Sequence, residues 1–196
     1  TFGRALVAAG SMNYTGAAYL ACMGACRAGA GLVTLAVPQS LHAVFAAKLT
    51  ETTFLPLPET APGEIDIDAV EIIRQCLADY NVLLIGCGLG QNKATGRFVQ
   101  SLLQTKSLPP LVLDADALNI MSGVPGWWKS APGAIVTPHP GEMARLLGAS
   151  IASVQSDRLG TAAKAAEDWN TVVVLKGDYS VIASPEGSLH VRQFAN

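Results

Sequence analysis

The chain has 196 residues and a net charge of −2; 14% of its residues are charged and half are hydrophobic. This length suits one domain, and so few charges favour a buried sheet covered on both faces over a disordered chain. No run of lysine or arginine stands out, so we expect neither nucleic acid nor an anionic membrane as a partner.

The cysteine pattern and the apolar stretches indicate a cytoplasmic protein. Cys22 and Cys26 have helical spacing, and no histidine pair follows them at the spacing of a zinc site. The longest apolar stretch, residues 16–37, contains Arg27 and several glycines, which favours a helix and a strand over a membrane span. A signal peptide is not recognisable, and the chain opens almost directly on a strand, so we expect its true N-terminus to lie upstream.

Short apolar runs that end in glycine or polar residues predict the strands. In chain order they are residues 4–10, 32–38, 82–86, 111–115, 134–138 and 172–177, with an antiparallel edge pair at 180–184 and 189–193. Apolar stripes predict helices between them: Val70, Ile73, Leu77 and Tyr80; Phe98, Val99, Leu102 and Leu103; Ile151, Val154, Ala162, Ala163, Ala166 and Trp169. This alternation predicts an α/β fold, a three-layer α/β/α sandwich whose mainly parallel sheet has an antiparallel edge.

Ligands of such sheets bind outside the carboxyl ends of the strands, so the loops there are the candidate sites. After the first strand, Gly16, Ala17 and Ala18 open a helix of small residues. Small residues let a ligand approach the free N–H groups, although close helix packing explains them equally well. After the third strand, "GCGLGQ" fails the dinucleotide fingerprint at Gln91, so it predicts bare backbone beside a ligand or simply a tight turn.

The stretch "LVLDADALN" places Asp114 at a strand end and Asp116 at the predicted N-cap of a helix. Asp114 or Asn119 is a candidate to hold Mg²⁺ or a phosphate. Helix capping explains the stretch nearly as well.

The stretch "TPHPGE" ends a strand on His139, which lies between two prolines. Pro140 suits the first helical position, and Glu142 follows His139 at the spacing of a capping box. We expect Arg145 to pair with Glu142. We also expect His139 to project into the crevice and contact an uncharged polar ligand, the alternative being a histidine that bonds only its own turn.

The stretch "LKGDYS" ends a buried strand on Lys176. Lysine is a natural phosphate partner at such a position, and Gly177 lets backbone N–H groups approach the ligand. The alternative is an ordinary hairpin whose lysine faces solvent.

Together these segments resemble the ADP/ATP-dependent NAD(P)H-hydrate dehydratases, a family with the ribokinase-like fold. "IGCGLG", "LVLDADALN", "TPHPGEMARLLG" and "VVLKGDYSVIASPEG" occur in the family's order, and the likeness spans nearly the whole chain. It implies repair of hydrated NADH and NADPH, with ADP or ATP as co-substrate and Mg²⁺ as cofactor. Gly86-Cys87-Gly88 stands where the family usually has Gly-Pro-Gly.

The resemblance also implies the site. Ala17, Gly88 and His139 would contact the hydrated dinucleotide; Lys176, Gly177, Asp178, Tyr179 and Ser180 would form the adenine-nucleotide loop. The family's catalytic Asp would lie beyond Asn196, so we expect no catalytic residue in this chain, which would be a single ribokinase-like domain (1–196) incomplete at its C-terminus and also at its N-terminus.

Two other functions and one question of assembly stay open at the sequence level. A ribokinase-like kinase of a small vitamin or sugar alcohol would use the same nucleotide loop. A non-catalytic dinucleotide-binding protein would suit the missing Asp loop. A homo-oligomer is possible, since Trp127 and Trp128 suit an assembly surface as well as a core.

Overall fold

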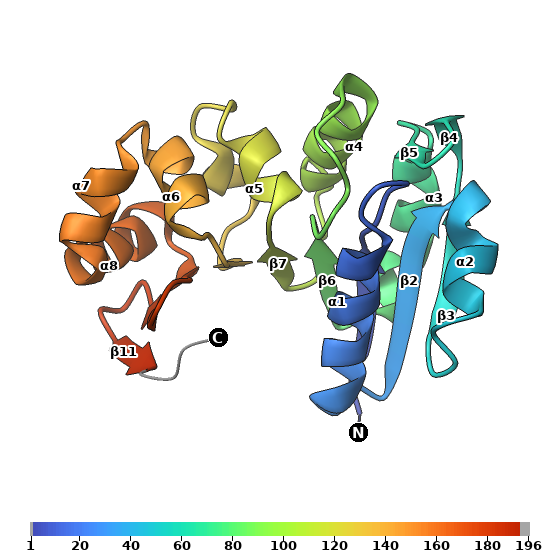
Figure 1. Ribbon diagram of the computed structural model, residues 1–196, viewed down its shortest axis with the longest axis horizontal. Helices are drawn as coiled ribbons and strands as arrows, with labels where there is room; N and C mark the ends of the chain where they lie inside the picture. The colour runs from blue at the N-terminus through green and yellow to red at the C-terminus, as the bar shows by residue number, and fades with distance from the viewer. Residues whose placement is uncertain (1, 193–196) are drawn as a thin grey trace. The chain divides into compact units, whose positions relative to one another are not determined.

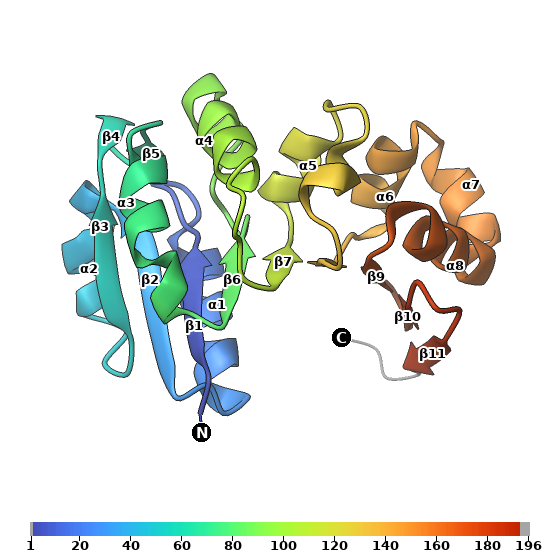
Figure 2. The ribbon, with the colours of Figure 1, turned by 180° about the vertical axis from the view of Figure 1, so that it is seen from behind.

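The computed structural model describes residues 2–192, which form two compact units. The first unit ends at Leu111 and the second begins at Val112. Figures 1 and 2 show both units from opposite sides. Among the described residues, no helix is both long and apolar enough to cross a membrane.

The first unit contains a parallel sheet whose strand order is β6–β1–β2–β3. Its strands are β1 (Arg4–Ala8), β2 (Leu32–Pro38), β3 (Thr53–Leu57) and β6 (Val82–Ile85), followed after β3 by a small antiparallel hairpin, β4 (Glu59–Ala61) and β5 (Glu64–Ile65). The predicted strands at 4–10, 32–38 and 82–86 are confirmed. Strand β3 was not predicted because Pro56 interrupts its apolar run, a residue that a sheet accepts on an edge strand.

Helices cover both faces of this sheet, as the predicted sandwich requires. Helices α1 (Thr15–Arg27) and α2 (His42–Ala46) lie in front of the strands in Figure 1, and α3 (Ala69–Cys76) lies in front of them in the reverse view of Figure 2. Helix α4 (Lys93–Leu103) packs on α3. The stripe predicted at residues 98–103 is buried.

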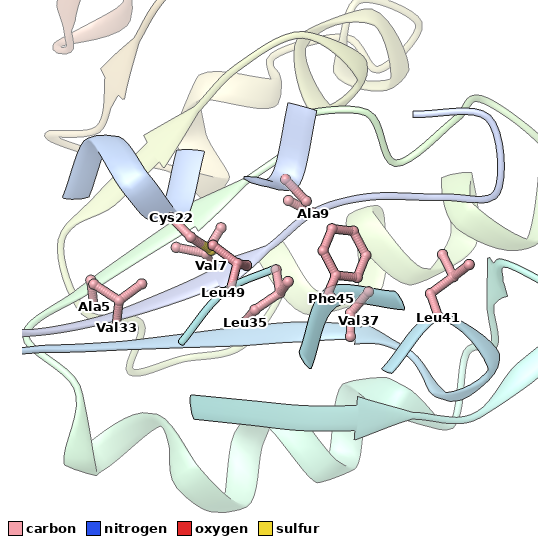
Figure 3. Close-up of a cluster of buried hydrophobic side chains, with 11 residues drawn as sticks. Ala5, Val7, Ala9, Cys22, Val33, Leu35, Val37, Leu41, Phe45 and Leu49 are labelled. Carbon is pink, nitrogen blue, oxygen red and sulfur yellow. The ribbon is translucent and has the colours of Figure 1, made fainter. Parts of the chain in front are cut away.

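The core of the first unit lies between the sheet and the α1–α2 layer (Figure 3). Parallel register sets Ala5 beside Val33 and Val7 beside Leu35, so alternate residues of β1 and β2 share one face. Phe45 from α2 and Cys22 from α1 close over them. This packing fixes the end of β1, from which the chain leads into the start of α1.

The second unit contains five strands in the order β11–β10–β9–β8–β7. They are β7 (Leu111–Leu113), β8 (Ile135–Val136), β9 (Val172–Leu175), β10 (Ser180–Ala183) and β11 (Leu189–Arg192). The first three in chain order are parallel, and β10 runs antiparallel to β9 and β11. The predicted antiparallel edge is therefore confirmed.

Four helices accompany these strands: α5 (Asp116–Met121), α6 (Pro140–Leu147), α7 (Ile151–Ser156) and α8 (Arg158–Trp169). The single helix predicted over residues 151–169 is wrong. Asp157 interrupts it, and its carboxylate accepts a hydrogen bond from Gly160 N at 2.9 Å, which caps α8. Ile151 is 55% exposed and so lies outside the buried stripe.

The tryptophans of the second unit form a cluster. Trp127 is buried, and its ring centroid lies 5.1 Å from that of Trp169, with Trp128 stacked on Trp169. Core packing explains Trp127, whereas oligomerisation stays a prediction. The four cysteines are free thiols, of which Cys22 is fully buried and the others are partly exposed.

Candidate functional site

A cation and a carboxylate meet at the carboxyl ends of the parallel strands of the second unit. Lys176 follows β9 and Asp114 follows β7, and Lys176 Nζ lies 2.6 Å from Asp114 Oδ1. Thr137, which follows β8, donates its hydroxyl to the same oxygen at 2.6 Å. The side chains of Lys176 and Asp114 are 34% and 23% exposed, so the pair is reachable from solvent.

The strand order explains how these residues meet. Strand β8 lies between β7 and β9, and neighbouring strands are about 4.8 Å apart, so only a long side chain can reach from β9 to β7. A lysine ammonium has three donors, and the contact with Asp114 engages one of them. The pair therefore fixes the ammonium at the sheet edge while leaving donors for an anion.

The backbone beside Asp114 is strained. Ala115 has φ 51° and ψ −113°, a left-handed conformation that residues with a side chain rarely adopt. Ala115, not Asp116, is the N-cap of α5, so the predicted cap is wrong by one residue; Asp116 is the first helical residue. Strain of this kind persists where the surrounding structure holds it, and it is often found at functional sites.

His139 forms the predicted capping box. Its Nδ1 accepts hydrogen bonds from the N–H groups of Gly141 at 2.9 Å and Glu142 at 3.3 Å, and Glu142 Oε2 accepts from His139 N at 2.8 Å. Because Nδ1 accepts, the neutral ring carries its proton on Nε2. The side chain is 50% exposed, with Nε2 3.4 Å from the buried Glu142 carboxylate. His139 thus serves its own turn, and half of its side chain stays exposed.

Asn119 and Arg145 form a second polar contact. Arg145 Nη1 donates to Asn119 Oδ1 at 2.7 Å. The predicted pairing of Arg145 with Glu142 is wrong, because the guanidinium turns to α5 and Glu142 turns to His139. Asn119, a candidate metal ligand, therefore already has a donor on its side-chain oxygen.

The site offers one carboxylate, that of Asp114, which suits Mg²⁺ bound together with nucleotide phosphates. Among residues 2–192, no group of three His, Cys, Asp or Glu side chains is placed to hold a metal ion. Mg²⁺ commonly keeps several waters and binds through one or two carboxylates together with substrate phosphates. Asp114 supplies one such carboxylate, so the residues present fit that mode and not a cage of protein ligands.

The segment after β9 turns sharply between β9 and β10. Asp178 and Tyr179 are exposed at its tip, and Ser180 begins β10. Arg158, at the start of α8, lies beneath this turn and donates to three of its carbonyl groups. A Cβ on Gly177 would lie 2.7 Å from Arg158 Nη2, so a larger residue there would require the guanidinium to move.

In the first unit, Ala17 and Gly88 meet at the start of α1. Gly88 has φ +67°, and a Cβ there would lie 2.9 Å from Ala17 Cβ and 2.7 Å from Tyr14 Cβ. Tyr14, the N-cap of α1, makes no side-chain capping bond, while Gly16 has no neighbouring atom within 4 Å of the position its Cβ would take. The two predicted residues are therefore neighbours, packed too closely for a larger residue at position 88.

Two residues of the site, Arg158 and Thr137, were not predicted from the sequence. A signal for Arg158 was present, because it lies four, seven, eight and eleven residues before the buried positions of its helix, Ala162, Ala165, Ala166 and Trp169. A cation on the buried face of a helix is costly unless hydrogen bonds or an opposite charge compensate it. Thr137 had no such signal, since its role depends on the neighbouring strand.

Known proteins share this architecture and these segments. The sequence model of the family described as NAD(P)H-hydrate dehydratase matches residues 5–195. A bifunctional NAD(P)H-hydrate repair enzyme Nnr from Moorella thermoacetica is 44% identical over the whole chain, which covers 37% of that relative. An ADP-dependent (S)-NAD(P)H-hydrate dehydratase from Neisseria meningitidis serogroup B is 35% identical, and the chain covers 63% of it.

A solved structure has a similar fold. An ADP/ATP-dependent NAD(P)H-hydrate dehydratase from Bacillus subtilis, co-crystallised with ATP/Mg²⁺ and soaked with CoA, superposes with a TM-score of 0.77 and 29% identity. The match covers all of this chain and 67% of that one. The chain thus spans between about a third and two thirds of the curated relatives described above.

Proposed function

Because the chain belongs to the NAD(P)H-hydrate dehydratase family, we propose that the protein carrying it uses ADP or ATP to dehydrate hydrated NADH or NADPH. The observation that carries the proposal is the Lys176–Asp114 pair at the carboxyl edge of the sheet, 2.6 Å apart and reachable from solvent. Its lysine is the first residue of the loop to which the resemblance assigns the adenine nucleotide.

The chemistry answers a leaving-group problem. Hydroxide leaves the hydrated nicotinamide ring poorly, whereas phosphate leaves well. The substrate hydroxyl loses its proton and attacks the terminal phosphorus of the nucleotide, whose bridging P–O bond breaks. The ring-nitrogen lone pair then expels phosphate, and loss of a proton from the neighbouring ring carbon restores the dihydronicotinamide. The sum is hydrated dinucleotide plus ATP to dinucleotide, ADP, phosphate and a proton, or the same with ADP giving AMP.

Phosphoryl transfer depends on positioning and on stabilising the charge that moves. We assign Lys176 to the phosphates, because its ammonium is held at the strand end with donors to spare. Gly177, Asp178, Tyr179 and Ser180 form the rest of the nucleotide loop. Mg²⁺, when bound with the nucleotide, supplies neutralisation of phosphate charge, and Asp114 is the residue that would hold it.

We assign the hydrated dinucleotide to Ala17, Gly88 and His139. The close packing of Ala17 on Gly88 leaves backbone with little side-chain cover at the start of α1, where N–H groups lack a side-chain cap. His139 offers Nε2–H as a donor on a rigid turn. We do not assign the role of general base to Asp114, since it is engaged by Lys176 and Thr137.

A competition experiment tests this function against the alternatives. The protein is titrated by calorimetry with ADP, ATP and hydrated NADH, and then assayed for phosphoryl transfer to a panel of small alcohols. Nucleotide binding together with binding of the hydrate, and no phosphorylated alcohol, is the expected result. Phosphorylation of an alcohol would indicate a small-molecule kinase, and binding of dinucleotides without any turnover would indicate a binding protein.

A further inference from the structure

We propose that Arg158 is a positioning residue whose buried guanidinium holds residues 175–180 in the shape that binds nucleotide phosphates. The inference rests on the function proposed above. It concerns a residue of α8 that belongs to none of the segments to which the resemblance assigns a role.

The location of Arg158 needs an explanation. Arg158 is only 7% exposed. It is the first residue of α8 and lies on the buried face of that helix, with Ala162, Ala165 and Trp169. Burying a charge is costly unless hydrogen bonds compensate it. Within residues 2–192, no carboxylate is paired with Arg158, so its compensation comes from elsewhere.

Carbonyl groups of the turn supply that compensation for Nη2, while the buried Nε has no hydrogen-bond partner among the described residues. Arg158 Nη2 donates to the carbonyl oxygens of Leu175 at 3.1 Å, Lys176 at 3.1 Å and Tyr179 at 2.8 Å. Nη1 donates to Gln155 Oε1 at 2.9 Å, and the guanidinium carbon lies 5.1 Å from the centre of the Tyr179 ring. One side chain therefore holds both ends of the turn.

These contacts also orient an N–H group of the turn. In a trans peptide the C=O of one residue and the N–H of the next point in opposite directions. The carbonyl of Lys176 faces Arg158, so the N–H group of Gly177 faces away from it. The N–H group of Ser180 does not join it, because Ser180 pairs with Arg192 of β11. Backbone N–H groups turned outward in this way form anion-binding sites, and the positive charge beneath them adds to the attraction.

Gly177 lies against the guanidinium of Arg158. A Cβ there would lie 2.7 Å from Nη2, 2.8 Å from Nη1 and 2.9 Å from Cζ of Arg158. A side chain at position 177 would require the guanidinium to shift from its present place. Arg158 thus gives a second reason, besides approach of a ligand, for the glycine that follows Lys176.

Calorimetry on variants of the protein carrying this chain tests the inference. Arg158→Met removes the donors and the charge but keeps the apolar stem; Lys164→Met, on the same helix at an exposed position, is the matched control. Arg158→Met should weaken ADP or ATP binding about tenfold or more, while hydrated-NADH affinity changes by no more than about twofold. Lys164→Met should change neither affinity.

Chemical rescue separates positioning from a merely structural role. In Arg158→Ala, added guanidinium ion should restore part of the nucleotide affinity, whereas urea, of similar shape but uncharged, should not. If Arg158→Met does not fold, Arg158→Lys is measured instead, with a smaller loss confined to nucleotide expected because the charge stays while the planar fork is lost.

The outcomes distinguish the two proposals. Unchanged nucleotide affinity in the folded Arg158 variants, with only a lower melting temperature, would overturn the positioning role and leave the proposed function standing. Absence of ADP and ATP binding by the unaltered protein would overturn both.

Discussion

Lys176 reaches past β8 to Asp114, so that its Nζ lies 2.6 Å from Asp114 Oδ1 at the carboxyl edge of the sheet. The two residues are 62 positions apart in the sequence and two strands apart in the sheet. The contact holds a cation at the place where a phosphate would arrive. It also means that Lys176 and Asp114 act as a pair, and that removing either changes the other.

Lys176→Ala should weaken binding of ADP or ATP. Loss of one charge-assisted phosphate contact costs ~1.5–3 kcal/mol, which is roughly a tenfold to hundredfold loss of affinity by calorimetry. Lys164→Ala is the control, since it removes a lysine that is 76% exposed and pairs only on its own helix. Equal nucleotide affinity in Lys176→Ala and the unaltered protein would remove Lys176 from the site.

Two substitutions at position 139 separate capping from ligand binding. His139→Ala removes the acceptor for two N–H groups of α6 and should cost about 0.5–2 kcal/mol in the free energy of unfolding. His139→Asn keeps a capping acceptor and should retain most of that stability. Both lose the Nε2–H donor, so both should weaken binding of hydrated NADH. Full dinucleotide affinity in His139→Asn would restrict His139 to its structural role.

Gly88→Ala should destabilise the first unit more than Gly90→Ala does. Both glycines have positive φ, +67° and +81°, so both variants strain the backbone. The new Cβ at position 88 would also overlap Tyr14 and Ala17, whereas at position 90 the nearest atom is Ser11 Oγ at 3.9 Å. Overpacking adds roughly 1–3 kcal/mol, measurable by urea unfolding. Equal losses of unfolding free energy in the two variants would show that α1 shifts to make room for the Cβ at position 88.

Cys22 should make the stability fall at high pH. Burial raises the pKa of its thiol from 9.0 to about 12, with the neighbouring Cys26 as a smaller cause. The unfolded chain loses this proton first, so it binds fewer protons than the folded chain, and the free energy of unfolding declines as pH rises from 9 towards 12. Cys22→Ala should show a shallower decline in urea unfolding across that range; an identical slope would contradict the pKa shift.

Local signals in the sequence predicted much of the fold. Strands β1, β2 and β6 are continuous apolar runs, and the capping box of His139 needs only neighbours three residues apart. Strand β3 was missed because its proline is acceptable only at a sheet edge, a position that the local sequence does not reveal. The break between α7 and α8 at Asp157 was not predicted. An aspartate between apolar positions is equally typical of an exposed residue within one continuous helix.

The candidate site was predictable as a set of positions but not as a set of contacts. Parallel strands bring Asp114, Thr137 and Lys176 to one edge, which the strand pattern anticipates. The pairing of Lys176 with Asp114 depends on β8 lying between their strands, and sequence alone does not give strand order. The burial of Arg158 was predictable from its helix, but its contacts were not, since its partners are backbone carbonyls 17 to 21 residues away.

Formation of NADH from its purified hydrate tests the proposed function most directly. The protein carrying this chain is incubated with hydrated NADH, Mg²⁺ and either ADP or ATP, and the absorbance of NADH and the released phosphate are followed together. We expect NADH and phosphate to appear in equal amounts, only when nucleotide is present, and much more slowly in Lys176→Ala. NADH formation without nucleotide, or nucleotide consumption that yields no NADH, would contradict the proposed dehydration.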